Sequence, residues 1–229
     1  MDCDEESSRP AHAIDPTMLA PLPVWRARQV NAVRERMDAA CCVFDFTVRQ
    51  MPVGRSVGEA QHRAVLSCLF DEIDGLCGQR HREFLASHPA HANSPAWQPS
   101  HDVTQARPAP WPWGDAGDAR AFRPGQRVHF TRNPAHVNPF EWLFQAFDDP
   151  PYKADCPPGL FADFCDVVGL LPGQGVQVFD WVGDPDQEPH RSTWSPYFEA
   201  GKEWWGIWCL TVWNPRRRTL AALAASTTD

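Results

Sequence analysis

Apolar residues recur at helical spacing in four segments of the chain. In each segment their spacing is close to that of one helix face, with polar residues on other faces, which indicates a helix with one face in a core. We expect these helices over residues 25–37, 56–87, 138–147 and 157–171. The buried stripes of the first two are expected to be Trp25, Val30, Val33 and Met37, and then Val57, Val65, Leu69, Ile73 and Leu76.

The second of these segments carries signals for both a start and a break. Ser56, followed three residues later by Glu59, is typical of a capping box at a helix N-terminus. Gly75 and Gly78 predict an interruption near the middle, with a second helical piece that runs to about Ser87.

Runs of β-branched and aromatic residues predict the strands. They cover residues 41–49, 126–131, Val176–Val182, Glu203–Trp213 and Arg218–Ser226. The turn residues Asn214 and Pro215 favour a hairpin between the last two, and we expect the last three strands to be neighbours. Helices and strands in this order predict an α+β fold, with an antiparallel sheet that ends in a Trp-rich hairpin and is covered by helices.

The strand 203–213 is apolar on both faces. Alternation sends Trp205, Ile207 and Cys209 to one side of a sheet and Trp204, Trp208 and Leu210 to the other. This pattern is typical of a central strand covered on both sides. Because an indole N–H needs a partner, some of these rings are expected to reach the domain edge, where they could line a pocket or a binding surface.

Two segments lack any periodicity. Residues 1–23 are polar and acidic and predict a disordered tail, whereas 24–229 is expected to form one domain. Within it, 88–126 carries many prolines, which cannot donate backbone hydrogen bonds. We expect a functional loop or a linker there, with 108–113 in polyproline II conformation.

Composition and charge narrow the classes of partner. The 229 residues carry a formal net charge of -8, without a basic block that would bind nucleic acid. No apolar run is long enough to span a membrane, and the start does not resemble a signal peptide, so we expect a cytoplasmic protein. In that reducing compartment the eight cysteines are expected to remain thiols. Since no Cys-x-x-Cys pair is present, no metal site is expected.

The C-terminal part resembles a known group of proteins. The segments Tyr197-Phe-Glu-Ala-Gly-Lys-Glu-Trp-Trp-Gly206, Thr211-Val-Trp-Asn-Pro215 and Ala225-Ser-Thr-Thr-Asp229 are similar to the ends of small bacterial proteins. Some of these resemble immunity proteins that accompany secreted polymorphic toxins. The resemblance spans roughly 35 residues. It implies a bacterial origin and an immunity role.

No finished catalytic motif is visible in the chain. The glycine-containing fragments complete neither a phosphate-binding loop nor a nucleophile elbow. The carboxylates of Asp180, Asp184 and Glu203 leave open a hydrolase or transferase that uses an acidic pair. His88, His91 and His101 are expected to be solvent-exposed. We expect a non-enzymatic protein without cofactor or metal.

Acidic residues are concentrated in one part of the chain. Residues 138–215 contain twelve acidic and three basic side chains, a net charge of -9, whereas 1–137 carries about -1. Acids that steer a basic partner and aromatic anchors that hold it would suit a protein that binds and neutralises a cognate toxin with a basic face. The residues expected to form this partner-binding surface are Asp184, Asp186, Glu188, Glu199, Trp204 and Trp205. A Trp-lined pocket for a small ligand remains the alternative, as does the carboxylate enzyme.

Overall fold

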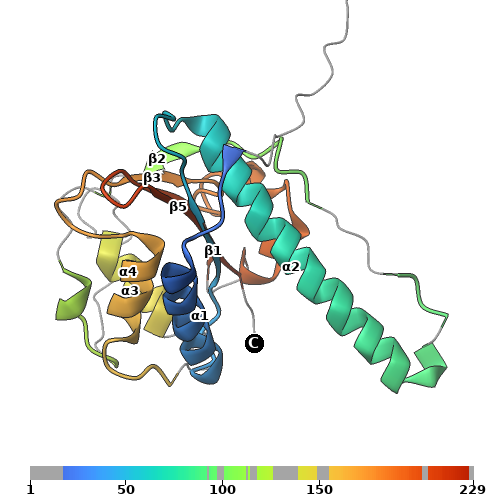
Figure 1. Ribbon diagram of the computed structural model, residues 1–229. Helices are drawn as coiled ribbons and strands as arrows, with labels where there is room; N and C mark the ends of the chain where they lie inside the picture. The colour runs from blue at the N-terminus through green and yellow to red at the C-terminus, as the bar shows by residue number, and fades with distance from the viewer. Residues whose placement is uncertain are drawn as a thin grey trace, which may run out of the picture.

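The computed structural model places a five-stranded antiparallel sheet between helices (Figure 1). It describes residues 18–91, 93–96, 101–111, 113, 118–125, 139–148, 155–202 and 206–226. The helices are α1 (Val24–Ala39), α2 (Glu59–Ser87), α3 (Pro139–Asp148) and α4 (Leu160–Val168). The strands are β1 (Asp45–Gln50), β2 (Ala109–Trp111), β3 (Gln177–Asp180), β4 (Ile207–Asn214) and β5 (Thr219–Ser226). The predicted α+β class and antiparallel sheet are confirmed.

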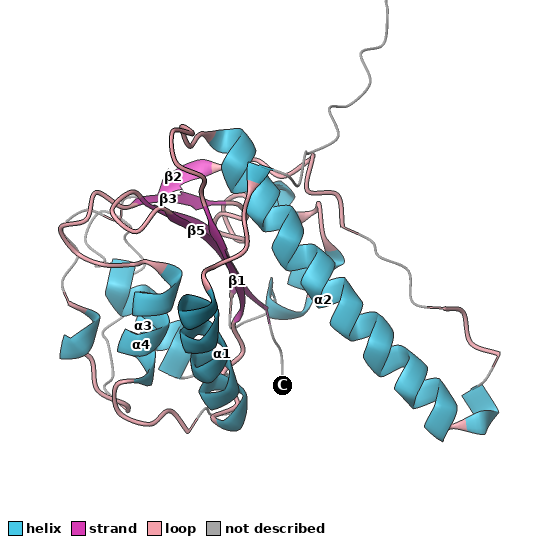
Figure 2. Ribbon diagram, viewed as in Figure 1, coloured by secondary structure: helices cyan, strands magenta, loops and turns pink. Residues whose placement is uncertain are grey.

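The strand order is β1-β5-β4-β3-β2, so β4 and β5 lie inside the sheet. All eight residues of β4 are buried. Trp208, Leu210 and Val212 face the core under α1, α3 and α4, whereas Cys209 and Trp213 face the core under α2. Figure 2 shows the two helical layers on either side of the sheet. The prediction of a central strand covered on both faces is therefore confirmed.

The end of α1 explains why β1 starts later than predicted. The N–H of Cys42 donates to the carbonyl of Met37 at 3.0 Å, and the N–H of Cys41 donates to that of Asp38 at 3.1 Å. These two bonds form a Schellman motif, with Cys41 in the left-handed conformation at φ 58°. Residues 41 and 42 thus terminate the helix, and the strand begins only at Asp45.

Helix α2 differs from the prediction in three ways. It begins after Gly58, whose N–H donates to the side-chain oxygen of Gln61, rather than at Ser56. It continues through Gly75 and Gly78 without a break. Its second half extends away from the sheet in Figure 1, so Leu76 is half exposed rather than buried. Packing of the first half outweighs the helix-propensity cost of each glycine, which is about 1 kcal/mol.

Part of the Pro-rich segment belongs to the sheet. Strand β2 pairs with β3, and Pro110 lies opposite Phe179. Proline is tolerated there because β2 is an edge strand, where a missing N–H can face outward. Val103 and Ala106 are buried in the core under α2. The prediction of a loop or linker in polyproline II conformation is therefore wrong for 109–111, which form a strand. The predicted strand 126–131 lies outside the described residues.

The C-terminal hairpin follows the predicted pattern. Strands β4 and β5 pair from Ile207–Ser226 to Asn214–Thr219, and β3 pairs with β4, so the three predicted neighbours do lie side by side. The amide of Asn214 donates to the carbonyl of Gly169 at 2.9 Å and thereby attaches the turn to the end of α4. Helix α4 is capped by Gly169, at φ 87°, and so ends before residue 171, the predicted end.

The start of the described chain and the first helix also differ from expectation. Ala20, within the predicted tail, exchanges two backbone hydrogen bonds of 2.9 Å with Gln50, so residues next to α1 are held against the sheet. Trp25 is 58% exposed, whereas Val30, Val33 and Met37 are buried as predicted. Among the described residues, no helix has the length and apolar character needed to cross a membrane.

Candidate functional site

The acidic loop, residues 180–191, begins where β3 ends. Asp180 accepts hydrogen bonds from the N–H groups of Val182 at 3.1 Å and Gly183 at 2.9 Å, which turns the chain out of the sheet. Burial raises the pKa of the Asp180 carboxyl, and these N–H groups together with Arg191 act against that rise. A buried carboxylate with several donors is a structural anchor.

Arg191 closes the acidic loop from the other end. One guanidinium nitrogen lies 3.3 Å from Asp180 Oδ2 and 2.9 Å from Glu188 Oε2. The other donates to the carbonyl of Asp180 at 2.8 Å and to that of Arg107 at 3.1 Å. The Arg191 side chain is only 9% exposed. Since Gly183 packs against the same group, this arrangement leaves the loop little room to move.

The predicted partner-binding carboxylates are presented to different degrees. Asp184 is half-buried and accepts hydrogen bonds from the N–H of Asp186 and the side-chain amide of Gln187. Asp186 is exposed. The carboxylate of Glu188 is about half exposed and pairs with Arg191. The loop therefore brings Asp184, Asp186 and Glu188 together.

The remaining predicted residues do not extend this group in the described structure. Glu199 lies outside the loop, on the short helical turns that precede β4, and its exposed carboxylate is 2.6 Å from the ammonium of Lys202. Trp204 and Trp205 lie outside the described residues. Of the predicted residues that the structure describes, Asp184, Asp186 and Glu188 thus lie together on one loop and Glu199 lies apart from them.

The geometry bears on one residue of the carboxylate alternative, Asp180. Asp180 is committed to Arg191 and to backbone N–H groups, and Glu203 lies outside the described residues. Within the described ranges, no group of three or more His, Cys, Asp or Glu residues is arranged to hold a metal ion. The pairing of Asp180 with Arg191 explains its position without a catalytic role.

The described tryptophans act mainly as core residues. The indole of Trp181 is fully buried and donates to the hydroxyl of Thr211 at 2.8 Å. Trp194 donates to the carbonyl of Trp181 at 3.2 Å. Trp111 and Trp142 stack with their ring centroids 5.2 Å apart at the β2 edge of the sheet. The N–H groups of Trp181 and Trp194 thus have hydrogen-bond partners, and Trp111 and Trp142 cover each other. None of these four rings lines either of the two hollows described below.

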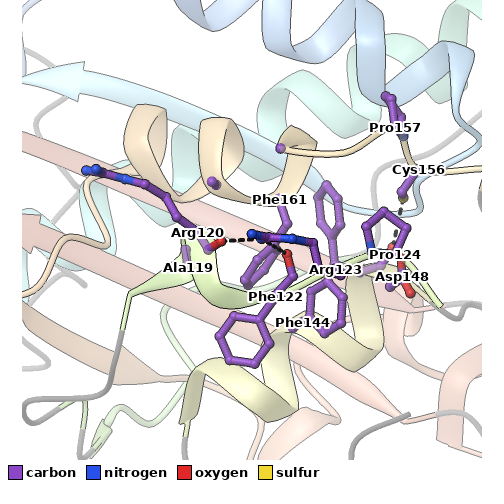
Figure 3. Close-up of a pocket in the computed structure, with 13 residues that line it drawn as sticks. Ala119, Arg120, Phe122, Arg123, Pro124, Phe144, Asp148, Cys156, Pro157 and Phe161 are labelled. Carbon is purple, nitrogen blue, oxygen red and sulfur yellow. Dashed lines mark hydrogen bonds between the residues drawn. The ribbon is translucent and has the colours of Figure 1, made fainter. Parts of the chain in front are cut away.

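Phenylalanines, rather than tryptophans, surround a small cavity between α3, α4 and residues 119–124 (Figure 3). Phe122, Phe144 and Phe161 line it, as do Cys156 and Asp148. The cavity volume is about 90 Å³. Sites for drug-sized ligands are several times larger, so this space suits only a very small molecule.

A larger hollow, the edge groove, follows the outer edge of β1 between α1 and α2. Its volume is about 530 Å³. Among the residues that line it are Leu19, Leu22, Val30, Arg34, Thr47, Arg49 and Glu72. On its floor, Glu72 accepts hydrogen bonds from Thr47 at 2.8 Å and Arg49 at 2.7 Å. Arg34 donates to the carbonyl of Phe46 and covers part of the strand edge.

Sequence reasoning missed the edge groove and also misjudged one histidine. The groove depends on two helices that are distant in sequence, and no local pattern signals their approach. His101, predicted to be exposed, has a side chain that is only 13% exposed and a ring nitrogen 2.7 Å from Asp74 Oδ2. The predicted exposure of His88 and His91 agrees with the structure.

Comparisons with known proteins add no further constraint. No protein-family description, curated protein or solved structure matches this chain.

Proposed function

We propose that this protein is an immunity-type protein that binds and neutralises a cognate bacterial toxin in the cytoplasm, with the acidic loop as part of its contact surface. The observation that carries the proposal is the attachment of this loop by Arg191. The loop contains four acidic residues and one arginine, and its exposed acids are held on a rigid support.

A rigid loop favours tight binding for a thermodynamic reason. Ordering a mobile loop on association costs free energy, and a loop that is already fixed avoids that cost. The carboxylates of Asp184 and Asp186 would accelerate encounter with a basic face of the toxin. The partner would be a protein, and neither a cofactor nor a metal takes part in this role.

The alternatives receive less support from the geometry. An enzyme built on Asp180 would first have to break its contacts with Arg191, at a cost of several kcal/mol. A Trp-lined ligand site has no matching hollow among the two described above, since the small cavity is lined by phenylalanines and the lining of the edge groove contains no tryptophan. Binding of a protein partner through the acidic loop requires neither the loss of the Asp180–Arg191 contacts nor a pocket.

The test uses the protein encoded beside this gene as the candidate toxin. We expect co-expression to rescue cells from that protein, and the two chains to co-purify. The double variant Asp184→Asn and Asp186→Asn keeps the side-chain oxygen that caps the loop but removes two charges. It is expected to slow association by about tenfold at low salt, with a smaller effect at high salt.

A matched control separates local from overall charge. Asp71→Asn with Glu83→Gln removes the same two charges from exposed positions on α2. We expect the association rate of this control to stay close to that of the unmodified chain. Equal slowing in both double variants would assign the effect to net charge. A neighbouring protein that is harmless alone and forms no complex would refute the immunity role itself.

A further inference from the structure

Two thiols that are far apart in sequence meet at the end of α1. The sulfur atoms of Cys42 and Cys156 are 3.3 Å apart, although 114 positions separate the residues. Cys156 is buried, and Cys42 is half-buried. A hydrogen bond between thiols accounts for this distance, so neither sulfur is bonded to the other in this state.

The backbone around both cysteines holds them in place. Cys42 is the last residue of the Schellman motif, through its bond to the carbonyl of Met37. The N–H of Asp155, next to Cys156, donates to the carbonyl of Ala40 at 3.0 Å. An S–S bond is about 2.05 Å long, so the sulfurs need to approach by only about 1.3 Å, a distance within reach of side-chain rotation.

The contact between the two thiols favours loss of a proton from Cys156. The hydrogen bond between the two sulfurs lowers the pKa of Cys156 from its ordinary value, whereas burial and the nearby carboxylates of Asp148 and Asp155 oppose this. The same shared proton raises the pKa of Cys42, so the second ionisation is the harder one. A thiolate at Cys156 would be the nucleophile, because the thiolate is the reactive form.

The phenylalanine-lined cavity offers a route to Cys156. This residue belongs to the cavity lining and is drawn with it in Figure 3. The volume of about 90 Å³ is enough for a molecule the size of hydrogen peroxide, since a water molecule occupies about 30 Å³ in the liquid. Bulky oxidants such as peptide disulfides are excluded from it.

We propose that Cys42 and Cys156 form a reversible disulfide with a hydroperoxide as the oxidant. The sulfur of Cys156 attacks one peroxide oxygen, the O–O bond breaks, and a sulfenic acid forms as water or an alcohol leaves. The sulfur of Cys42 then attacks the sulfur of Cys156, the S–O bond breaks, and a second water leaves with the Cys42 proton. The sulfurs lose two electrons and the peroxide gains them. Two equivalents of a small thiol restore the pair by exchange.

The experiment measures this bond directly. The reduced, desalted full chain is treated with one equivalent of hydrogen peroxide, alkylated, and digested without reductant. We expect a cross-linked peptide pair that lacks two hydrogen atoms and joins residues 37–49 to the peptide containing Cys156. Fragment-ion sequencing distinguishes Cys156 from Cys165. Oxidation should also raise the unfolding temperature by several degrees, and a small thiol should reverse this rise.

The variants assign the roles. Cys42→Ser should abolish the cross-link and leave Cys156 as a sulfenic acid that dimedone labels. Cys41→Ser should leave the cross-link unchanged, which excludes the adjacent thiol, and Cys77→Ser serves as a control elsewhere in the fold. Circular dichroism confirms that each variant is folded. The proposal is overturned if Cys42 and Cys156 of the unmodified chain remain alkylatable after peroxide, or if cross-links among other cysteines form equally fast.

Discussion

The indole N–H of Trp181 donates to the hydroxyl of Thr211 at 2.8 Å inside the core between the sheet and α2. The same hydroxyl lies 2.8 Å from Nδ1 of His62, on α2. All three side chains are completely buried. One hydroxyl of β4 therefore satisfies two polar groups that could not otherwise remain in an apolar core without a cost.

Replacing this hydroxyl tests its value. Thr211→Val keeps the shape of the side chain but leaves the Trp181 N–H and the His62 nitrogen without their partner. We expect a loss of about 2–4 kcal/mol in the free energy of unfolding, measured by urea titration. Thr211→Ser retains the hydroxyl and should lose clearly less. Equal stability of the Val and Ser variants would show that the hydroxyl contributes nothing.

Acid should weaken the fold through His62. Burial lowers the pKa of this histidine from 6.5 to about 4, so the folded chain binds fewer protons than the unfolded chain between these values. Above pH 6.5 His62 is neutral in both states and does not reduce the free energy of unfolding. As the pH falls from 6.5 to 4, the unfolded chain takes up the proton first, and the free energy of unfolding decreases by roughly 3 kcal/mol in total.

The pH effect is isolated by comparison with His62→Leu. Burial raises the pKa of Asp45 and Asp180, which gives a pH dependence of the opposite sign. Only the difference between the two chains reports on His62. We expect the variant to lose less stability between pH 7 and pH 4.5 in matched urea titrations. Parallel curves would contradict the assignment.

Cys41→Gly is expected to stabilise the protein. Cys41 is exposed and adopts φ 58°, in a position of the Schellman motif that glycine usually fills. Relief of the left-handed strain should add about 1 kcal/mol to the free energy of unfolding, despite the greater freedom of glycine in the unfolded chain. Cys41→Ala keeps the strain and should be near neutral by comparison. Thermal unfolding of the three chains would decide.

Gly183 and Gly173 form a matched pair for the acidic loop. Both have a positive φ, 67° and 66° respectively, but only at Gly183 would a Cβ lie 2.6 Å from the Arg191 guanidinium. Gly173→Ala should cost about 1–2 kcal/mol from backbone strain alone. Gly183→Ala should cost at least about 2 kcal/mol more, because it displaces Arg191 from Asp180. If calorimetry gives similar losses of stability for the two variants, the acidic loop can accommodate the Cβ without separating Arg191 from Asp180.

Local patterns predicted the inner strands because those segments are unambiguous. In β4, every residue is apolar or small enough to be buried, and the turn at Asn214 leaves a hairpin as the simplest continuation. The same logic failed at Cys41 and Cys42. Their side chains suit a strand, but their backbone groups are needed to end α1.

Long-range contacts were beyond sequence reasoning. Arg191 contacts Asp180, eleven positions away, and the carbonyl of Arg107, 84 positions away. A count of charges along the sequence cannot show that the side chains of Asp180 and Arg191 are buried together. The meeting of Cys42 with Cys156 has the same cause. Such contacts follow from how the helices cover the sheet, which no short stretch of sequence encodes.

The position of β5 in the sheet has a consequence for synthesis on the ribosome. Among the described strands, β5 comes last in sequence, yet it lies between β1 and β4 and pairs with both. A nascent chain that has released β1 to β4 thus still lacks the strand that joins the first to the rest. Until Thr219–Ser226 emerges, two strands expose unpaired edges, and such edges are prone to aggregation. Because β1 is made first and its partner last, a chaperone that binds nascent chains would have to shield β1 for the longest time.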